Sequence, residues 1–190
     1  MKKLVAVFGP ASCIEGDALY TEAQELGRML AEANFSVVTG GYEGVMEAAS
    51  RGAHDVGGTA IGVTAEVYYA RGREANPYLT REIRVKSAND RTMELLDLPD
   101  AFIAIGNSTG TLVEVALAWD YMVKRFLPEK PLILLGTSWH NFIDCLSKGS
   151  DFQRTIRVVH PVHFVHEAAE YLREFFGPSA QLPSLDVINV

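Results

Sequence analysis

The sequence has few cysteines, an acidic charge balance and no hydrophobic run of membrane-spanning length. Cys13 and Cys145 are its two cysteines, and they form neither a CxxC pair nor a spacing typical of a zinc site. This favours a reducing compartment and free, mostly buried thiols. The formal net charge of −7 argues against a protein that binds a nucleic-acid polymer, because contacts to phosphates need a basic face. We therefore expect a small-molecule partner.

The N-terminal apolar run, residues 4–8, ends at Gly9 and Pro10, too early for the hydrophobic core of a signal peptide. With no membrane-spanning run, this predicts a cytoplasmic protein without a membrane partner. A hydrophobic content of 48% over 190 residues is enough to bury one full core. We expect one domain over residues 1–176 and a tail, 177–190, that packs on the domain or on a dimer partner.

Several motifs of well-known active sites are also absent. No GxGxxG follows the first apolar run and no GxxxxGK(S/T) occurs, so ordinary dinucleotide and ATP sites lose most of their support. Residues 138–140 lack the nucleophile-elbow pattern of acyl-transfer enzymes. His160, His163 and His166 are spaced by three, but Pro161 disfavours a helix there and a strand would alternate their faces. We expect neither a metal site nor a cofactor.

Strand-like and helix-like segments alternate along the chain. This alternation predicts a doubly wound α/β fold, in which helices cover both faces of a parallel sheet. Residues 64–80 show no sustained period and are expected to form a long functional loop. The expected strands are residues 4–8, 35–38, 59–63, 82–86, 101–105 and 131–135 with one more inside 156–165, and the expected helices are 17–33, a segment from 45, 89–98, 111–126, 139–146 and 167–176.

Two Gly-rich turns, residues 39–44 and 106–111, are expected at the carboxyl ends of strands, where such a sheet binds ligands. The second turn opens a long helix, and the N–H groups and partial positive charge of a helix start suit a phosphate. Glu114 is expected in the first turn of that helix. There it either simply complements the helix dipole or acts on the group that the phosphate anchors.

Residues 71–91 form a locally basic segment, with six Arg and Lys against three Asp and Glu. Such a segment can steer an anionic ligand, although any one of these charges is equally consistent with a solvated loop. Tyr68, Tyr69 and Tyr78 either stack on a base or cover the core. The helix expected at 111–126 is apolar on most faces and must be covered on more than one side. We expect a homodimer through it.

The two turns together resemble a known family. Residues 39–46, Thr-Gly-Gly-Tyr-Glu-Gly-Val-Met, are similar to the GGGxxGLM motif of the LONELY GUY (LOG) family, long mislabelled as lysine decarboxylases. Residues 106–114, Gly-Asn-Ser-Thr-Gly-Thr-Leu-Val-Glu, are similar to its PGGxGTxxE motif. The resemblance spans roughly residues 3–176.

The resemblance implies a Rossmann-like homodimer that hydrolyses the N-glycosidic bond of AMP or of cytokinin riboside 5′-monophosphates, releasing the base and ribose 5-phosphate. It places Arg91 and Glu114 at the catalytic positions. A carboxylate there can stabilise the oxocarbenium-like sugar or orient water, and Arg91 can hold it and contact phosphate. The implied phosphate and nucleotide ligands are Gly40, Gly41, Gly106, Asn107, Ser108, Thr109, Gly110, Thr111 and Ser12.

The second turn departs from the family motif. Gly106 replaces the motif's proline, and Asn107 and Ser108 replace its two glycines. Their side chains can donate hydrogen bonds to a phosphate but also narrow the approach to the backbone. An alternative function therefore stays open, a non-catalytic binding or carrier protein for a nucleotide or phosphorylated cofactor, similar to the molybdenum-cofactor carriers of the same superfamily.

Overall fold

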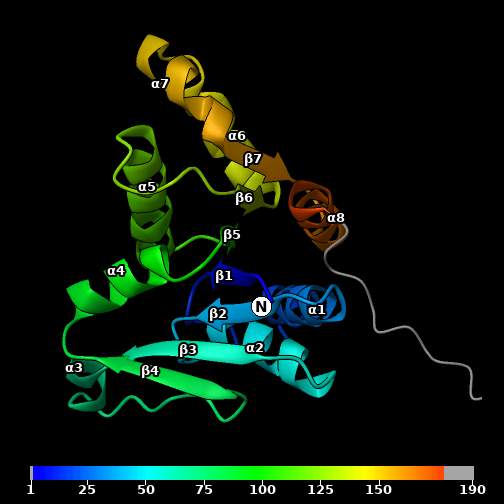
Figure 1. Ribbon diagram of the computed structural model, residues 1–190, viewed down its shortest axis with the longest axis vertical. Coiled ribbons are helices and arrows are strands. Elements are labelled where there is room, and N and C mark those ends of the chain that lie inside the picture. The colour runs from blue at the N-terminus through cyan, green and yellow to red at the C-terminus, as the bar shows by residue number, and fades with distance from the viewer. Residues whose placement is uncertain (1, 178–190) are drawn as a thin grey trace, which may run out of the picture.

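The structure, a computed structural model, describes residues 2–177. Within these residues seven parallel strands form one sheet in the order β4-β3-β2-β1-β5-β6-β7 (Figure 1). The predicted doubly wound α/β fold is confirmed. The strands are β1 (Leu4–Phe8), β2 (Ser36–Thr39), β3 (Ala60–Ala65), β4 (Arg81–Val85), β5 (Ala101–Ile105), β6 (Leu132–Leu135) and β7 (Val159–Val162). The helices are α1 (Ala18–Glu32), α2 (Val45–Asp55), α3 (Glu66–Tyr69), α4 (Ala88–Asp97), α5 (Thr109–Val123), α6 (Thr137–Leu146), α7 (Ser150–Thr155), the 3-10 helix η1 (Ile156–Val158) and α8 (Val165–Phe176).

The side chains of the central strands alternate between two hydrophobic cores, one on each face of the sheet. In β1, Val5 and Val7 belong to the core formed with α1, α2 and α8, whereas Ala6 and Phe8 belong to the core formed with α4, α5 and α6. All residues of β5 are buried, as its continuous apolar run predicts for a strand covered on both faces. None of the helices within the described residues has the length and apolarity to cross a membrane.

The strand order creates the crevice in which a site can form. From β1 the chain moves outward through β2, β3 and β4, then returns to β5 on the other side of β1 and continues to β7. The chain that leaves β1 and the chain that leaves β5 therefore turn away from each other, toward opposite faces of the sheet. Both Gly-rich turns follow strands near this reversal, which is where open α/β sheets bind their ligands.

Several elements differ from the expectations drawn from the sequence, among them α6 and α8, which begin at Thr137 and Val165, two residues earlier than expected. α5 begins at Thr109 instead of residue 111, because Ser108 extends the helix by capping it. Residues 64–80 are not one loop, since β3 continues to Ala65 and α3 follows directly. The pattern did not indicate α7, a short polar helix without amphipathic period.

Two further expectations concern the thiols and the C-terminus. Cys13 is buried, but Cys145 is exposed on α6, so the expectation of mostly buried thiols is wrong for Cys145. The tail expected to pack at 177–190 lies outside the described residues beyond Gly177.

Helices α1 and α2 pack at backbone contact. A Cβ atom at Gly27 of α1 would collide with the carbonyl oxygen of Ala49, and one at Gly52 of α2 would collide with that of Gln24. The two glycines therefore let the helices approach closely, at a cost in helix propensity of about 1 kcal/mol each.

The substitution Gly27→Ala tests this contact. It should lower the free energy of unfolding by about 2 kcal/mol despite the better helix propensity of alanine, because the helices must separate. Urea denaturation followed by circular dichroism measures the change. In the control Gly149→Ala, the nearest atom to the new Cβ is 3.5 Å away, and the stability should stay the same. A stabilised Gly27→Ala protein would contradict the close packing.

Candidate active site

A cavity of about 370 Å³ opens at the carboxyl ends of the central strands. Its wall brings together the predicted catalytic pair, Arg91 and Glu114, with three residues of the predicted phosphate turn, Ser108, Gly110 and Thr111. These residues come from α4 and the start of α5, which are adjacent helices on one face of the sheet. The volume is within the range of small-molecule sites.

The start of α5 lies in the cavity wall and is capped by Ser108. The Ser108 hydroxyl accepts a hydrogen bond from the N–H of Thr111 at 3.2 Å and lies 2.9 Å from the Thr111 hydroxyl. The N–H groups of Thr109 and Gly110 precede any intrahelical acceptor, so they remain available to a ligand. Unbonded N–H groups and the positive end of the helix dipole are the features by which helix starts bind anions.

The first two residues of this turn, Gly106 and Asn107, contact α6 and do not line the cavity. Gly106 has φ +64°, and its carbonyl accepts a hydrogen bond from the indole N–H of Trp139 at 3.0 Å. A proline, which the family motif has at this position, is fixed near φ −65° and cannot adopt this backbone conformation. The Asn107 carboxamide oxygen accepts a hydrogen bond from the Ser138 hydroxyl at 3.0 Å. Both residues therefore contact the start of α6.

Arg91 is held by backbone carbonyls at the ends of two strands. Its Nε donates to Val63 at 2.9 Å and its Nη2 donates to Gly40 at 3.0 Å. The guanidinium also lies over the rings of Tyr42 and Tyr68, 5.4 and 5.6 Å from their centroids. These contacts fix a positive charge in the wall of the cavity.

The glycines of the first turn create the space for this arginine. A Cβ atom at Gly40 would collide with the Arg91 guanidinium. Gly41 has φ +79°, and its N–H donates to the Thr39 hydroxyl at 3.1 Å. The predicted binding residues that do not line the cavity are Gly40, Gly41, Gly106, Asn107, Thr109 and Ser12.

Glu114 lies in the second turn of α5, not the first as expected, because the helix begins at Thr109. Its carboxyl group has no hydrogen-bond or ion-pair partner among residues 2–177. Burial raises the pKa of Glu114 to about 7, and the positive charge of Arg91 opposes part of this rise. Near neutral pH both forms of the acid are populated, which suits a group that stabilises positive charge or moves a proton.

The remaining wall contains residues that the motifs do not indicate. Tyr42, Tyr68, Arg71 and Arg73 also line the cavity. The signals for Tyr68, Arg71 and Arg73 were the basic character of segment 71–91 and the tyrosines before it, which are too unspecific to select individual residues, and Tyr42 stands at a variable position of the first motif.

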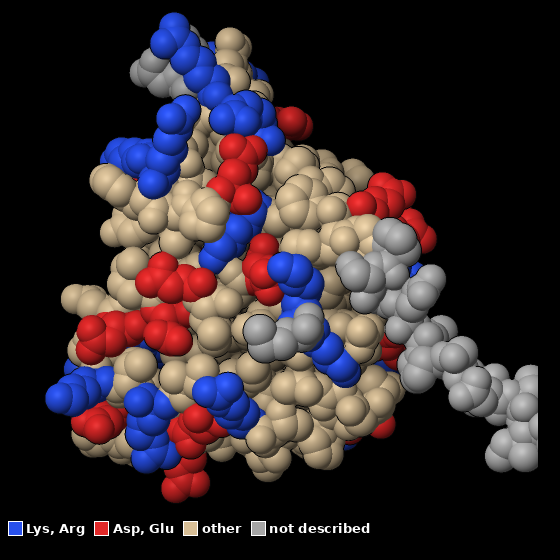
Figure 2. Space-filling model, viewed as in Figure 1, with Lys and Arg blue, Asp and Glu red and all other residues tan. Residues whose placement is uncertain are grey.

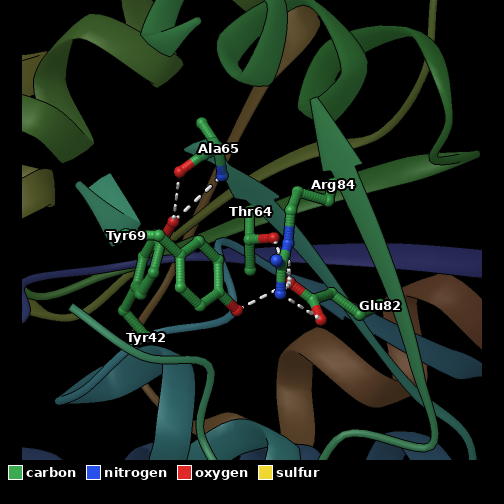
Figure 3. A network of polar contacts seen from close by, with 6 residues as sticks. All are labelled: Tyr42, Thr64, Ala65, Tyr69, Glu82 and Arg84. Atoms are coloured by element: carbon green, nitrogen blue, oxygen red, sulfur yellow. Dashed lines mark hydrogen bonds and ion pairs between the residues drawn. The ribbon is translucent and has the colours of Figure 1, made fainter. Parts of the chain in front are cut away.

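A polar network holds this wall in place (Figure 3). The Tyr42 hydroxyl accepts from the N–H of Ala65 at 2.9 Å and donates to its carbonyl oxygen at 3.3 Å. The Tyr69 hydroxyl donates to Glu82 at 2.7 Å, and the Arg84 guanidinium lies 3.8 Å from the Tyr69 ring centroid. Tyr69 is thus fixed on the outer side of α3, which leaves its neighbour Tyr68 to face the cavity.

The histidines near the C-terminus have separate roles. His160 lies 2.8 Å from the Tyr171 hydroxyl, and His163 stacks on His140 with ring centroids 3.7 Å apart. Among residues 2–177, no three His, Cys, Asp or Glu side chains are grouped as a metal site.

A sequence profile of the SLOG cluster4 family matches residues 2–162. The chain belongs to this family. A cytokinin riboside 5′-monophosphate phosphoribohydrolase from Rhodococcoides fascians is 33% identical over 137 residues, which cover 70% of this chain and 68% of that protein.

Two solved structures of molybdenum-cofactor proteins are also similar to this chain. The molybdenum cofactor binding protein from Rippkaea orientalis superposes with a TM-score of 0.74 at 26% identity, over 93% of this chain and 99% of that chain. The molybdenum cofactor carrier protein from Chlamydomonas reinhardtii superposes with a TM-score of 0.70 at 25% identity, over the same shares. The predicted resemblance to LOG proteins and molybdenum-cofactor carriers is confirmed.

The raised pKa of Glu114 predicts a stability that depends on pH. The folded state binds the Glu114 proton more tightly than the unfolded chain, so the contribution of this group to stability is fully present below its ordinary pKa of 4.5 and is lost as pH rises toward 7. Glu114→Gln should therefore be as stable as the unmodified protein near pH 4.5 and about 2 kcal/mol more stable at pH 8. Urea denaturation across this range measures the difference.

The control for this experiment is Glu94→Gln on α4, since this residue lies outside the cavity wall. It should leave the pH dependence of stability unchanged. A Glu114→Gln protein that is less stable at pH 8 than the unmodified one would show that the carboxylate is paired.

Proposed function

We propose that the protein hydrolyses the N-glycosidic bond of a nucleoside 5′-monophosphate, AMP or a cytokinin riboside monophosphate, to the free base and ribose 5-phosphate. The observation that carries the proposal is the unpaired carboxyl group of Glu114, which shares one cavity with the charge of Arg91 and the open start of α5. The similarity to the Rhodococcoides fascians phosphoribohydrolase supports it.

In this proposal the 5′-phosphate binds the N–H groups of Thr109 and Gly110 and the hydroxyls of Ser108 and Thr111. Arg91 adds a positive charge and orients the ligand. Gly40 and Gly41 contribute indirectly, through the position of Arg91. Gly106 and Asn107 fix the turn against the start of α6, through Trp139 and Ser138.

The chemistry follows from this placement. When the bond between the sugar C1′ and the base breaks, its electron pair leaves with the base and positive charge develops on the sugar. The carboxylate of Glu114 stabilises this charge and orients a water molecule toward C1′. Water supplies the hydroxyl group of ribose 5-phosphate, and its proton passes to the departing base. Ionised Glu114 is thus the active form.

A second candidate, a carrier of a phosphorylated cofactor or nucleotide, is favoured by one specific observation. The conformation of Gly106 excludes the proline of the hydrolase motif, and the Ser108 side chain occupies a position where that motif has glycine. The structural similarity to the two molybdenum-cofactor proteins, over 93% of this chain, agrees with this candidate.

Base release separates the two candidates. The purified protein should release free adenine or isopentenyladenine from the corresponding monophosphates, detected by chromatography. Glu114→Gln should lower kcat by at least about a hundredfold with little change in ligand affinity.

The value of kcat/KM should rise tenfold per pH unit below the Glu114 pKa of about 7 and level off above it.

Tight nucleotide binding without base release, at any pH between 5 and 9, would establish the carrier instead. Unchanged turnover in Glu114→Gln would remove this carboxyl group from the reaction.

We further propose that the protein forms a homodimer through α5 and the residues that follow it to 126. Val113, Val123 and Phe126 are exposed apolar residues on this segment. A groove of about 240 Å³ runs between α5, α6 and α7 and is almost wholly apolar, with Trp119 and Phe142 in its wall. A second copy of the chain would cover this surface.

Val123→Glu tests the dimer. A charge in the covered groove should shift the protein from dimer to monomer in sedimentation equilibrium, because its desolvation is not compensated. Val56→Glu, an equally exposed valine after α2, should leave the dimer intact. A monomeric unmodified protein at micromolar concentration would contradict the proposal.

A further inference from the structure

The Arg91 side chain is held in the cavity wall by neutral groups. On the outer surface over α3 and β4, positive and negative side chains are intermixed (Figure 2), and Arg84 there pairs with Glu82 at 3.1 Å. Arg91 forms no ion pair among the described residues. Two carbonyl oxygens at strand ends, the sulfur of Met46 at 3.6 Å and two tyrosine rings surround it instead. Its orientation therefore depends on uncharged contacts.

These contacts use three of the five N–H groups of the Arg91 guanidinium. Nε donates to Val63, and Nη2 donates to Gly40 and to the Met46 sulfur. Nη1 has no partner among residues 2–177, so its two N–H groups remain for a ligand or for Glu114. The direction of Nη1 is set by the plane in which the guanidinium is held.

Tyr42 supplies the more firmly fixed of the two rings beside this guanidinium. Its ring centroid lies 5.4 Å from the guanidinium carbon of Arg91, and the residue is 1% exposed. Its hydroxyl contacts both backbone groups of Ala65 (Figure 3), and its own carbonyl accepts a hydrogen bond from the Asn76 side chain at 3.1 Å. Tyr68, at 5.6 Å, is only half-buried, and its hydroxyl has no partner among the described residues.

The position of the Arg91 charge matters for Glu114. The other charged and titratable side chains of the cavity wall are those of Tyr42, Tyr68, Arg71 and Arg73. It is the charge of Arg91 that opposes the effect of burial on the pKa of Glu114. A guanidinium that turned away from α5 would leave this carboxyl group under the effect of burial alone.

We infer that Tyr42 is a positioning residue of the site, whose ring packs against the guanidinium and holds the charge of Arg91 beside Glu114. The inference rests on the proposed function and adds to it a residue that the motif does not indicate. A cation beside an aromatic face is held most strongly where water is excluded, as it is at this buried ring. An aliphatic side chain in the same place offers no such face, so the guanidinium could turn its donors toward water.

Titration of the Glu114 carboxyl group tests the inference. Protein labelled with carbon-13 at the glutamate carboxyl groups is followed by NMR across the pH range, and the Glu114 signal is assigned by its loss in Glu114→Gln. In Tyr42→Leu the midpoint, about 7 in the unmodified protein, should rise by at least about half a pH unit. Tyr42→Phe retains the ring and should retain the midpoint. Tyr42→Met, also without an aromatic face, replaces the leucine variant if that one does not fold.

The matched control is Phe35→Leu, which removes a buried ring from the core formed with α1, α2 and α8. It should lower stability without moving the Glu114 midpoint. An unchanged midpoint in Tyr42→Leu would overturn the inference, since the ring would then be purely structural. So would a lowered midpoint, because the ring would then act by excluding water from Glu114, and so would an equal rise in Tyr42→Phe.

The NMR titration does not require turnover, so the two proposals can fail separately. If base is released but the midpoint stays at its value in Tyr42→Leu, the hydrolase stands and the role of Tyr42 is wrong. If the midpoint rises in Tyr42→Leu alone and no nucleotide loses its base, the role of Tyr42 stands and the hydrolase is wrong. If both hold, the midpoint of kcat/KM should rise by the same amount, whereas a loss of folded protein would lower kcat/KM equally at every pH.

Discussion

The site depends on the two hydrogen bonds that fix the Arg91 guanidinium to the carbonyl oxygens of Val63 and Gly40. A charged donor on a carbonyl forms a stronger hydrogen bond than a neutral one, so this side chain is held in one orientation. Its charge then lies beside Glu114 and lowers the pKa that burial raises. Without this anchoring, the carboxyl group would be buried without a compensating charge, and the cavity would lose its central cation.

The fixed position of the Arg91 guanidinium also explains why a glycine stands at position 40 of the first Gly-rich turn. The motif resemblance interprets Gly40 and Gly41 as ligand contacts, yet the guanidinium occupies the space that a Cβ at Gly40 would need. The Gly41 carbonyl accepts a hydrogen bond from the N–H of Asn76 at 2.8 Å, which ties the turn to the segment after α3. The sheet, the turn and the segment that carries Arg71 are therefore coupled through main-chain contacts around one arginine.

The fold could be predicted from the sequence because the central strands are continuous apolar runs, as in 101–105, and helices such as α1 and α8 have apolar residues at helical spacing. The residues that line the cavity could be predicted only in part. Ser108, Gly110 and Thr111 are found by their position at a helix start, and Arg91 and Glu114 by resemblance. Which tyrosine faces the cavity is decided by tertiary contacts, since the hydrogen bond from Tyr69 to Glu82 spans 13 positions of the chain. No local pattern records such a contact.

The carboxyl group of Glu114 is what separates hydrolysis from simple ligand carriage. A cradle of N–H groups and arginines holds an anion equally well for either purpose. A carboxylate facing an anionic ligand repels it, and burying this group without a hydrogen-bond partner costs stability as the pH rises through its pKa of about 7. A protein that only carries a phosphorylated molecule gains nothing from this arrangement. A protein that must stabilise a positively charged sugar needs an ionisable group in this place, and the cost in stability then has a chemical reason.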